Sequence, residues 1–166
     1  LEHLIELNPH GTGRSAVRFM AATLRKRFLS SPAAFGNTVS EHAKTIHNKG
    51  RKVSDERIAD LIESADDSFD DDDEASEAAN EAVRATSTVI SVDDELLGML
   101  GGLEAWGEAN RSRESGRVNA LSKLIDEVCK ASDGDWGDGR LIVFTEYRDT
   151  LQHVRTQALQ GTRRNI

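Results

Sequence analysis

Apolar side chains recur every three or four residues through the first part of the chain, the spacing that places them on one face of an α-helix. One helix is predicted from Ser15, as its N-cap, to about Leu29, and a second from Ser31 and Pro32 to near Asn48–Gly50. The short connection between them predicts a helical hairpin. The residues predicted to line its buried side are Val17, Met20, Ala21, Leu24, Phe28, Phe35, Val39, His42, Ala43 and Ile46.

The middle of the chain combines helical patterns with a run of like charges. A third helix is predicted to start at Ser54, whereas the acidic run at residues 66–74 breaks all periodicity and predicts a mobile loop. Ala75 to Thr88 is helical by propensity, and a further helix is predicted to begin at Ser91 and extend past Trp106. Three glycines weaken that helix by roughly 1 kcal/mol each relative to alanine, unless they let a neighbouring helix approach closely. They are Gly98, Gly101 and Gly102.

The last third contains the best amphipathic helix of the chain and a short apolar run. The helix is predicted at Ser115 to Ser132, and Leu141 to Phe144 suits a strand that is buried on both faces. A helical pattern from Tyr147 to Gln160 follows, so this stretch predicts the opening half of a βαβ unit. The predicted fold class is therefore mainly α: helical hairpins or a bundle, with one short C-terminal β-strand and the helix after it, as in a truncated α/β lobe.

Charge divides the chain into three predicted regions. Residues 1–52, a basic helical hairpin, carry 9 Lys and Arg against 3 Asp and Glu, a net charge of +6. Residues 53–110, an acidic helical insert, carry 2 against 18, or −16. Residues 111–166, a linker helix with the strand and the last helix, carry 10 against 8, or +2, which completes the total of −8. A basic face kept apart from an acidic region favours nucleic-acid binding, although charge blocks also serve only to solvate surfaces.

Three arginines, Arg14, Arg18 and Arg25, follow an outer face of the first predicted helix. They are candidates for contacts with nucleic-acid phosphates, and the alternative is a solvated face. His42 lies on a predicted buried stripe, which favours a core or boundary histidine over a metal ligand. No catalytic arrangement and no metal motif is recognised, and GTGRS at residues 11–15 lacks both the spacing and the lysine of a phosphate loop.

The chain shows no feature of a membrane or secreted protein. Its single cysteine, Cys129, excludes an internal disulfide and fits a reducing compartment. No apolar run is long enough to span a bilayer, and no signal-peptide pattern is present. We therefore expect a soluble, cytoplasmic protein that does not contact a membrane.

Two parts of the sequence add a resemblance to a known family. ESGRVNALSKLIDEV and the following RLIVFTEYRDTL, at residues 114–128 and 140–151, resemble the start of the second RecA-like lobe of Swi/Snf-type helicase-like ATPases of superfamily two. RKRFLSSPAAF, at residues 25–35, resembles a helical segment between the two lobes of bacterial members. The resemblance does not extend to residues 53–110.

The resemblance implies that the chain is part of a DNA-dependent ATPase or helicase, a helical accessory region that runs into the second motor lobe. ATP and Mg²⁺ would be bound by motifs of the parent protein outside residues 1–166, and no cofactor is expected in this segment. The implied partners are double-stranded DNA and the missing motor lobes in the same polypeptide. It also implies Thr145 and Arg148 as phosphate contacts, although Arg148 equally suits a salt bridge with Glu146 or Asp149. Tyr147 is expected to pack rather than to stack on a base.

Two other functions stay open. The chain could be a helical module that binds another protein through the apolar faces at Leu96 to Trp106 and Val118 to Val128, or a stand-alone basic hairpin that binds nucleic acid. Residues 141–144 discriminate between these functions, because an interaction module has no need of a buried strand and a truncated lobe requires one. An unpaired strand edge also invites another chain, so self-association through residues 141–144 is a further candidate interaction.

Overall fold

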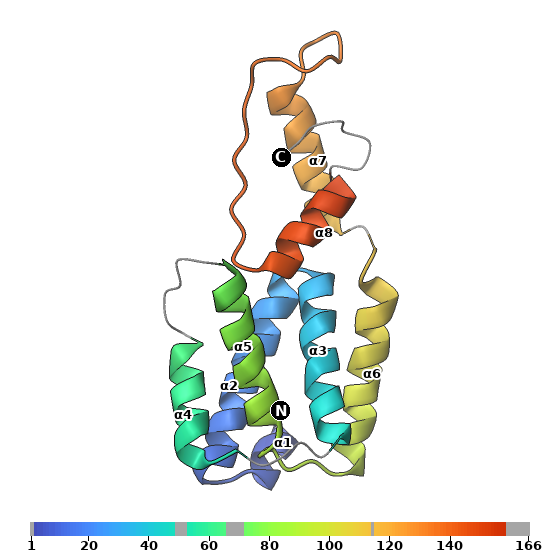
Figure 1. The fold of residues 1–166 in the computed structure, drawn as a ribbon. Coiled ribbons are helices and arrows are strands. Elements are labelled where there is room, and N and C mark those ends of the chain that lie inside the picture. The colour runs from blue at the N-terminus through green and yellow to red at the C-terminus, as the bar shows by residue number, and fades with distance from the viewer. Residues whose placement is uncertain (1, 49–52, 66–71, 114, 159–166) are drawn as a thin grey trace.

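The computed structural model describes residues 2–48, 53–65, 72–113 and 115–158, and this part of the chain is mainly helical and contains no sheet. Most of its eight helices pack side by side as a bundle, with α8 across one end and α7 extending beyond it (Figure 1). The predicted helical class is therefore confirmed. The helices are α1 (Glu2–Leu7), α2 (Gly11–Ser30), α3 (Pro32–His47), α4 (Asp55–Ser64), α5 (Asp72–Ser87), α6 (Asp94–Asn110), α7 (Gly116–Cys129) and α8 (Arg148–Ala158).

Short polar side chains start four of these helices. Each accepts a hydrogen bond from the backbone N–H three residues later, which satisfies one of the amides that a helix start leaves open. The four capping residues are Ser31, Ser54, Asp93 and Ser115. The start predicted at Ser15 is wrong, because α2 begins one turn earlier. There Gly11 has a φ of +60°, a left-handed conformation that glycine adopts without strain.

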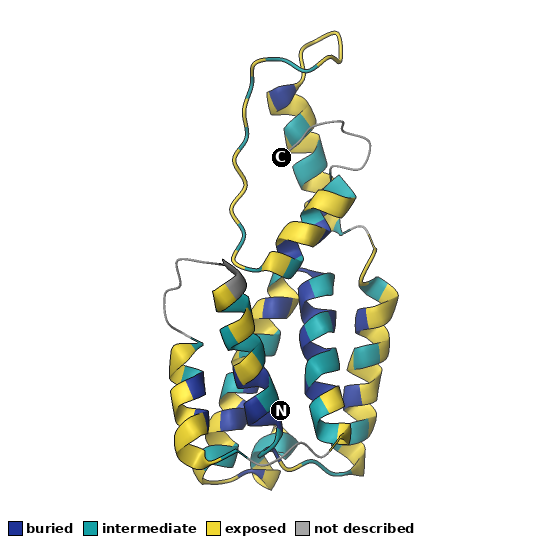
Figure 2. Cartoon of the chain, viewed as in Figure 1, coloured by how far each residue is buried: buried dark blue, intermediate teal, exposed yellow. Residues whose placement is uncertain are grey.

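The core lies between α2, α3, α4, α5 and α6, where the buried residues face the inside of the bundle (Figure 2). One cluster joins α2 to α5 and the segment after it: Ala16, Val17, Met20, Val83 and Ile90. A second joins α3 to α6: Phe35, Val39, Ala43 and Leu100. A third joins α4 to α5: Ile58, Leu61, Ala82 and Ala85. Helices of the basic and acidic regions thus pack against each other.

The acidic run is described only in part. Residues 66–71 lie outside the described residues, so the mobile loop predicted for 66–74 stays a prediction there. Asp72, Asp73 and Glu74 form the first turn of α5. The predicted loop is therefore wrong at residues 72–74, which are helical.

Backbone contact between α3 and α6 occurs at Gly36 and Gly107. A Cβ added to Gly107 would lie 2.7 Å from the Cα of Gly36, so a side chain there requires the helices to move apart. No described helix of the same chain makes the close approach that the sequence offers as an alternative for Gly98, Gly101 and Gly102. A Cβ at any of these three would meet nothing described within 4 Å.

Residues 141–144 do not form the predicted strand. They run as coil between α7 and α8 (Figure 1), and Ile142 and Phe144 are 77% and 90% exposed. A strand requires a neighbour that pairs with its backbone N–H and C=O groups, and no described segment lies in that position. The helix predicted after the run is present and begins at Arg148 as α8.

Candidate nucleic-acid interface

The predicted arginine row lies on the outside of α2. Arg14, Arg18 and Arg25 fall within about 40° around the helix, because positions four and seven residues apart return to one face. All three are exposed. Arg14 donates a hydrogen bond from Nη1 to the carbonyl of Pro9 at 3.1 Å. None of the three forms an ion pair with a described residue.

A groove of about 380 Å³ separates α2 from α4 beside this row. Its lining residues are Ser15, Arg18, Phe19, Ala22, Thr23, Lys26 and Ile62. Arg18 and Lys26 would attract an anion, and the hydroxyls of Ser15 and Thr23 could donate hydrogen bonds to one. However, α4 is rich in carboxylates, with four in ten residues. The exposed row is therefore a better surface for an extended polyanion than the groove is.

Thr145 and Arg148 lie at the start of α8, apart from Arg14. The Thr145 hydroxyl donates a hydrogen bond to the carbonyl of Tyr147 at 2.9 Å, within the turn that leads into α8. Arg148 is exposed at the first helical position. Because α8 contacts the C-terminal end of α2, Arg14 lies about 20 Å away along α2, at 1.5 Å per residue from the contact at Arg27. Arg14 and Arg18 thus lie along α2 away from α8, whereas Arg25 lies near the end of α2 that α8 contacts.

Arg27, which is not among the predicted site residues, lies at the centre of a buried polar junction. Its side chain is 2% exposed, its Nη1 lies 3.5 Å from a carboxylate oxygen of Asp149, and its guanidinium lies 4.2 Å from the centre of the Tyr147 ring. Burial lowers the pKa of Arg27, and Asp149 acts in the opposite direction. Tyr147 therefore packs, as expected, and its packing partner is an arginine.

Hydroxyl groups continue this junction towards α3. The hydroxyl of Thr150 lies 2.6 Å from that of Ser30 and 3.0 Å from that of Ser31. Ser31 is also the N-cap of α3. From α7, Arg117 donates hydrogen bonds to the carbonyls of Leu29 and Ser30. The corner between α2 and α3 thus holds α7 and α8 by polar contacts.

Two buried nitrogens near this corner have no partner among the described residues. They are Nε of Arg27 and Nε2 of His153, one turn after Asp149 on α8. A buried polar atom without a hydrogen bond costs about 1 to 3 kcal/mol. The junction is therefore held by charge and hydroxyl contacts at some cost in unsatisfied groups.

One sequence signal could have identified Arg27. It lies three residues after Leu24 and seven after Met20, on the stripe that otherwise holds buried apolar side chains. The sequence prediction gave the end of that stripe to Phe28, which is 53% exposed. Phe28 instead packs edge-on against Phe35, with ring centres 5.2 Å apart, and against Trp106 at 5.6 Å.

The prediction for His42 is confirmed. It is buried, and its Nδ1 lies 2.6 Å from the hydroxyl of Ser87 on α5. Burial lowers the pKa of His42 to about 4, so the ring is neutral at pH 7. This histidine joins α3 to α5 and belongs to the core.

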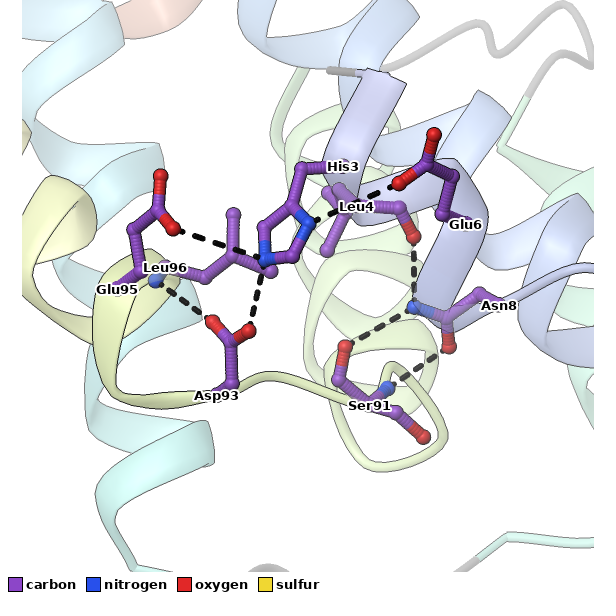
Figure 3. A network of polar contacts seen from close by, with 8 residues as sticks. All are labelled: His3, Leu4, Glu6, Asn8, Ser91, Asp93, Glu95 and Leu96. Atoms are coloured by element: carbon purple, nitrogen blue, oxygen red, sulfur yellow. Dashed lines mark hydrogen bonds and ion pairs between the residues drawn. The ribbon is translucent and has the colours of Figure 1, made fainter.

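A second polar network ties α1 to the start of α6 (Figure 3). His3 Nε2 lies 2.7 Å from a carboxylate oxygen of Asp93, which also caps α6. The hydrogen bond from His3 lowers the pKa of Asp93 after the larger effect of the Leu96 amide, and the same contact raises the pKa of His3. Nearby, Asn8 donates to the carbonyls of Leu4 and Ser91 and accepts from the Ser91 amide. These contacts join the N-terminus to the bundle.

Comparisons with protein-family models, with curated proteins and with solved structures find no match to this chain. Among the described residues, no helix combines the length and the apolar character that crossing a bilayer requires.

Proposed function

We propose that this chain is a helical accessory region between the two motor lobes of a superfamily-two, DNA-dependent ATPase. The parent protein would bind ATP and Mg²⁺, hydrolyse ATP and act on double-stranded DNA in the cytoplasm. This segment would link the motion of its second lobe to the bundle. Its arginine row on α2 would contact the phosphate backbone, and Thr145 and Arg148 would contact it at the start of α8.

The contact between the two stretches that resemble the family carries this proposal. Arg27, Ser30 and Ser31 belong to RKRFLSSPAAF, and their partners at positions 147, 149 and 150 belong to RLIVFTEYRDTL. The paired positions lie 119 to 122 residues apart in the sequence. A buried junction of this kind would transmit movement of the second lobe to the helical region.

The strand predicted at residues 141–144 is absent, because that run is coil, and its absence counts against the second-lobe part of the proposal. The exposure of the run is nevertheless consistent with a missing sheet. Two apolar surfaces of the same region remain partly exposed: the run itself, and the face of α7 that carries Leu124 and Val128. A parallel sheet supplied by the parent protein would cover both, since such sheets are buried on both faces.

DNA binding by the 166-residue chain tests the arginine row. We expect fluorescence anisotropy to detect binding to a labelled duplex that weakens steeply with added salt, because each phosphate contact releases counterions. Arg18→Ala and Arg25→Ala should each weaken binding several-fold and flatten the salt dependence. Arg57→Ala is the matched control, because Arg57 is exposed on α4 but is paired with Glu81 at 3.1 Å. Equal effects of Arg57→Ala and Arg18→Ala would refute the role of the row.

The coding sequence of the gene provides a separate test of the proposal that the parent protein is an ATPase. The coding sequence upstream of Leu1 should encode the phosphate-loop pattern G-x-x-x-x-G-K-[ST], because an ATPase of this class needs the backbone amides and the lysine of that loop. A coding sequence without this pattern would end the ATPase proposal, whether or not the chain binds DNA.

A specific observation favours the second function, a helical protein-interaction module. The apolar side chains of α6 are only partly used by the bundle, and Met99, Leu103 and Trp106 stay 39% to 57% exposed. If the chain does not bind DNA, the exposed face of α6 is the surface through which it would bind another protein.

A further inference from the structure

We propose that the exposed face of α6 is an interface between two copies of this chain, packed antiparallel about a twofold axis that crosses the helix at the height of residue 104, on the side opposite the Glu104 side chain. The inference rests on the second function above and not on DNA binding. Its starting point is that α6 packs on α3 through one side, at Leu100 and Gly107, while a second apolar side faces away from the bundle. Met99, Leu103 and Trp106 remain 39% to 57% exposed there, and grouped exposed apolar side chains are typical of interaction surfaces.

The apolar side chains of this face are held in place before any partner arrives. The ring of Trp106 packs against Phe28 and Phe35 with ring centres 5.6 Å apart in both cases. Both Trp106 and Phe28 remain partly exposed. A fixed, half-exposed tryptophan is the residue type that contributes most to protein interfaces, because little conformational freedom is lost when it is buried.

Small residues occupy the rest of the exposed face. Going along α6, they are Gly98, Gly101, Gly102, Ala105 and Ala109, all exposed. Each glycine weakens an isolated helix by about 1 kcal/mol relative to alanine. A neighbouring helix offsets this cost, because the absence of side chains lets large residues of the partner fill the space, as α3 and α6 already do at Gly36 and Gly107.

The order of large and small residues selects the antiparallel register. In a twofold antiparallel pair centred at the height of residue 104, each residue lies level with the partner residue that is equally far from position 104 in the other direction along the sequence. By the helical period, Gly102, Trp106, Met99 and Ala109 fall on one side of α6. Trp106 then lies over the partner's Gly102, and Met99 lies beside the partner's Ala109. Both large side chains meet small ones, so the helices can approach closely.

Charge supports the same orientation. The start of α6 carries Asp94 and Glu95, and Arg111 and Arg113 follow its last turn. In the antiparallel register Glu95 lies opposite the partner's Arg113, and the two helix dipoles oppose each other favourably. A parallel pair would place like charges together at both ends. The face is thus complementary to itself, as a twofold interface requires.

Light scattering during size-exclusion chromatography of the 166-residue chain, over a series of concentrations, tests the proposal. We expect a dimer. The substitution Gly102→Leu should raise the dissociation constant of this dimer at least tenfold and so favour the monomer. The substitution fills the space of the partner's Trp106, and it spares the fold because a Cβ there meets nothing within 4 Å. Gly116→Leu on α7 is the matched control, since Gly116 is also exposed with open space around it, and it should remain dimeric. A monomer at all concentrations, or a dimer that survives Gly102→Leu, would overturn the proposal.

Two further variants separate this interface from other routes to a dimer. Glu95→Arg should weaken the dimer, and Glu95→Arg combined with Arg113→Glu should restore it, because only the antiparallel register pairs these positions. Phe144→Asp tests association through residues 141–144 and should leave the dimer intact. Loss of the dimer in Phe144→Asp, with no effect of Gly102→Leu, would assign self-association to that segment instead.

Discussion

The bundle of α2 to α6 and the arm formed by α7, α8 and the coil between them are both helical, but they are stabilised differently. In the bundle, amphipathic helices bury aliphatic side chains such as Met20 and Val39 against one another. In the arm, α7 buries only Val118 and Cys129, and the buried residues of α8 are Thr150 and His153. The arm is attached to the bundle through hydroxyl and charge contacts. The comparison teaches that a helical pattern predicts an apolar face but does not provide the surface that covers it.

The largest difference should appear when one apolar side chain is truncated in each region. Met20→Ala removes a side chain that is 2% exposed, and we expect it to lower the free energy of unfolding by about 4 kcal/mol. Leu124→Ala on α7 removes one that is already 42% exposed and should cost about 0.5 kcal/mol. Urea denaturation followed by circular dichroism measures both. Equal losses would show that α7 has a core of its own.

The next largest effect is expected at the junction. Arg27→Ala removes the contacts of Arg27 with Asp149 and Tyr147, and because Asp149 is 31% exposed the loss should be at most about 3 kcal/mol. Because the contact holds the arm, the amides of α8 should exchange hydrogen faster by mass spectrometry while those of α3 and α5 keep their rates. Arg25→Ala, two residues away on the exposed face, should leave α8 protected. Uniformly faster exchange in the Arg27 variant would instead assign Arg27 to the stability of the bundle.

A smaller effect concerns pH and the bundle. Burial lowers the pKa of His42 to about 4, whereas the unfolded chain titrates near 6.5. The unfolded state therefore binds more protons between these values, so stability is full above pH 6.5 and is lost as the pH falls towards 4. Between pH 7 and pH 5 the loss should be about 2 kcal/mol. Denaturation of His42→Asn, which stays neutral, should show a flatter pH profile.

The smallest effect has the opposite sign and concerns the N-terminus. Asp93 raises the pKa of His3, so this contact stabilises the fold below the ordinary pKa of histidine and the contribution is lost as the pH rises through the raised value. Asp93→Asn keeps an oxygen that can cap α6 but removes the charge. NMR titration of His3 in this variant should show a lower pKa than in the unsubstituted chain. An unchanged pKa would mean that Glu6 and Glu95 hold the histidine.

The hairpin and the later helices could be predicted from the sequence because their signals are local. Ser31 caps α3, with Pro32 at its first turn, and the stripe from Phe35 to Ala43 is buried as expected. The arginine row could also be placed, since the helical period alone puts Arg14, Arg18 and Arg25 on one face. The junction could not be predicted, because its partners lie more than 100 residues apart in the sequence. No sequence pattern indicates which polar residues on one side contact those on the other.

The sequence by itself determined where most helices form and which of their faces are apolar, because periodicity and capping act within a few residues. Tertiary structure decided which of those faces are covered. Arg27 is buried and Phe28 is exposed because α8 contacts one side of α2 near its end. Residues 141–144 remain coil because a strand exists only beside another strand, and none of the described residues provides one. Such outcomes depend on the chain as a whole, since each requires a partner that is distant in the sequence.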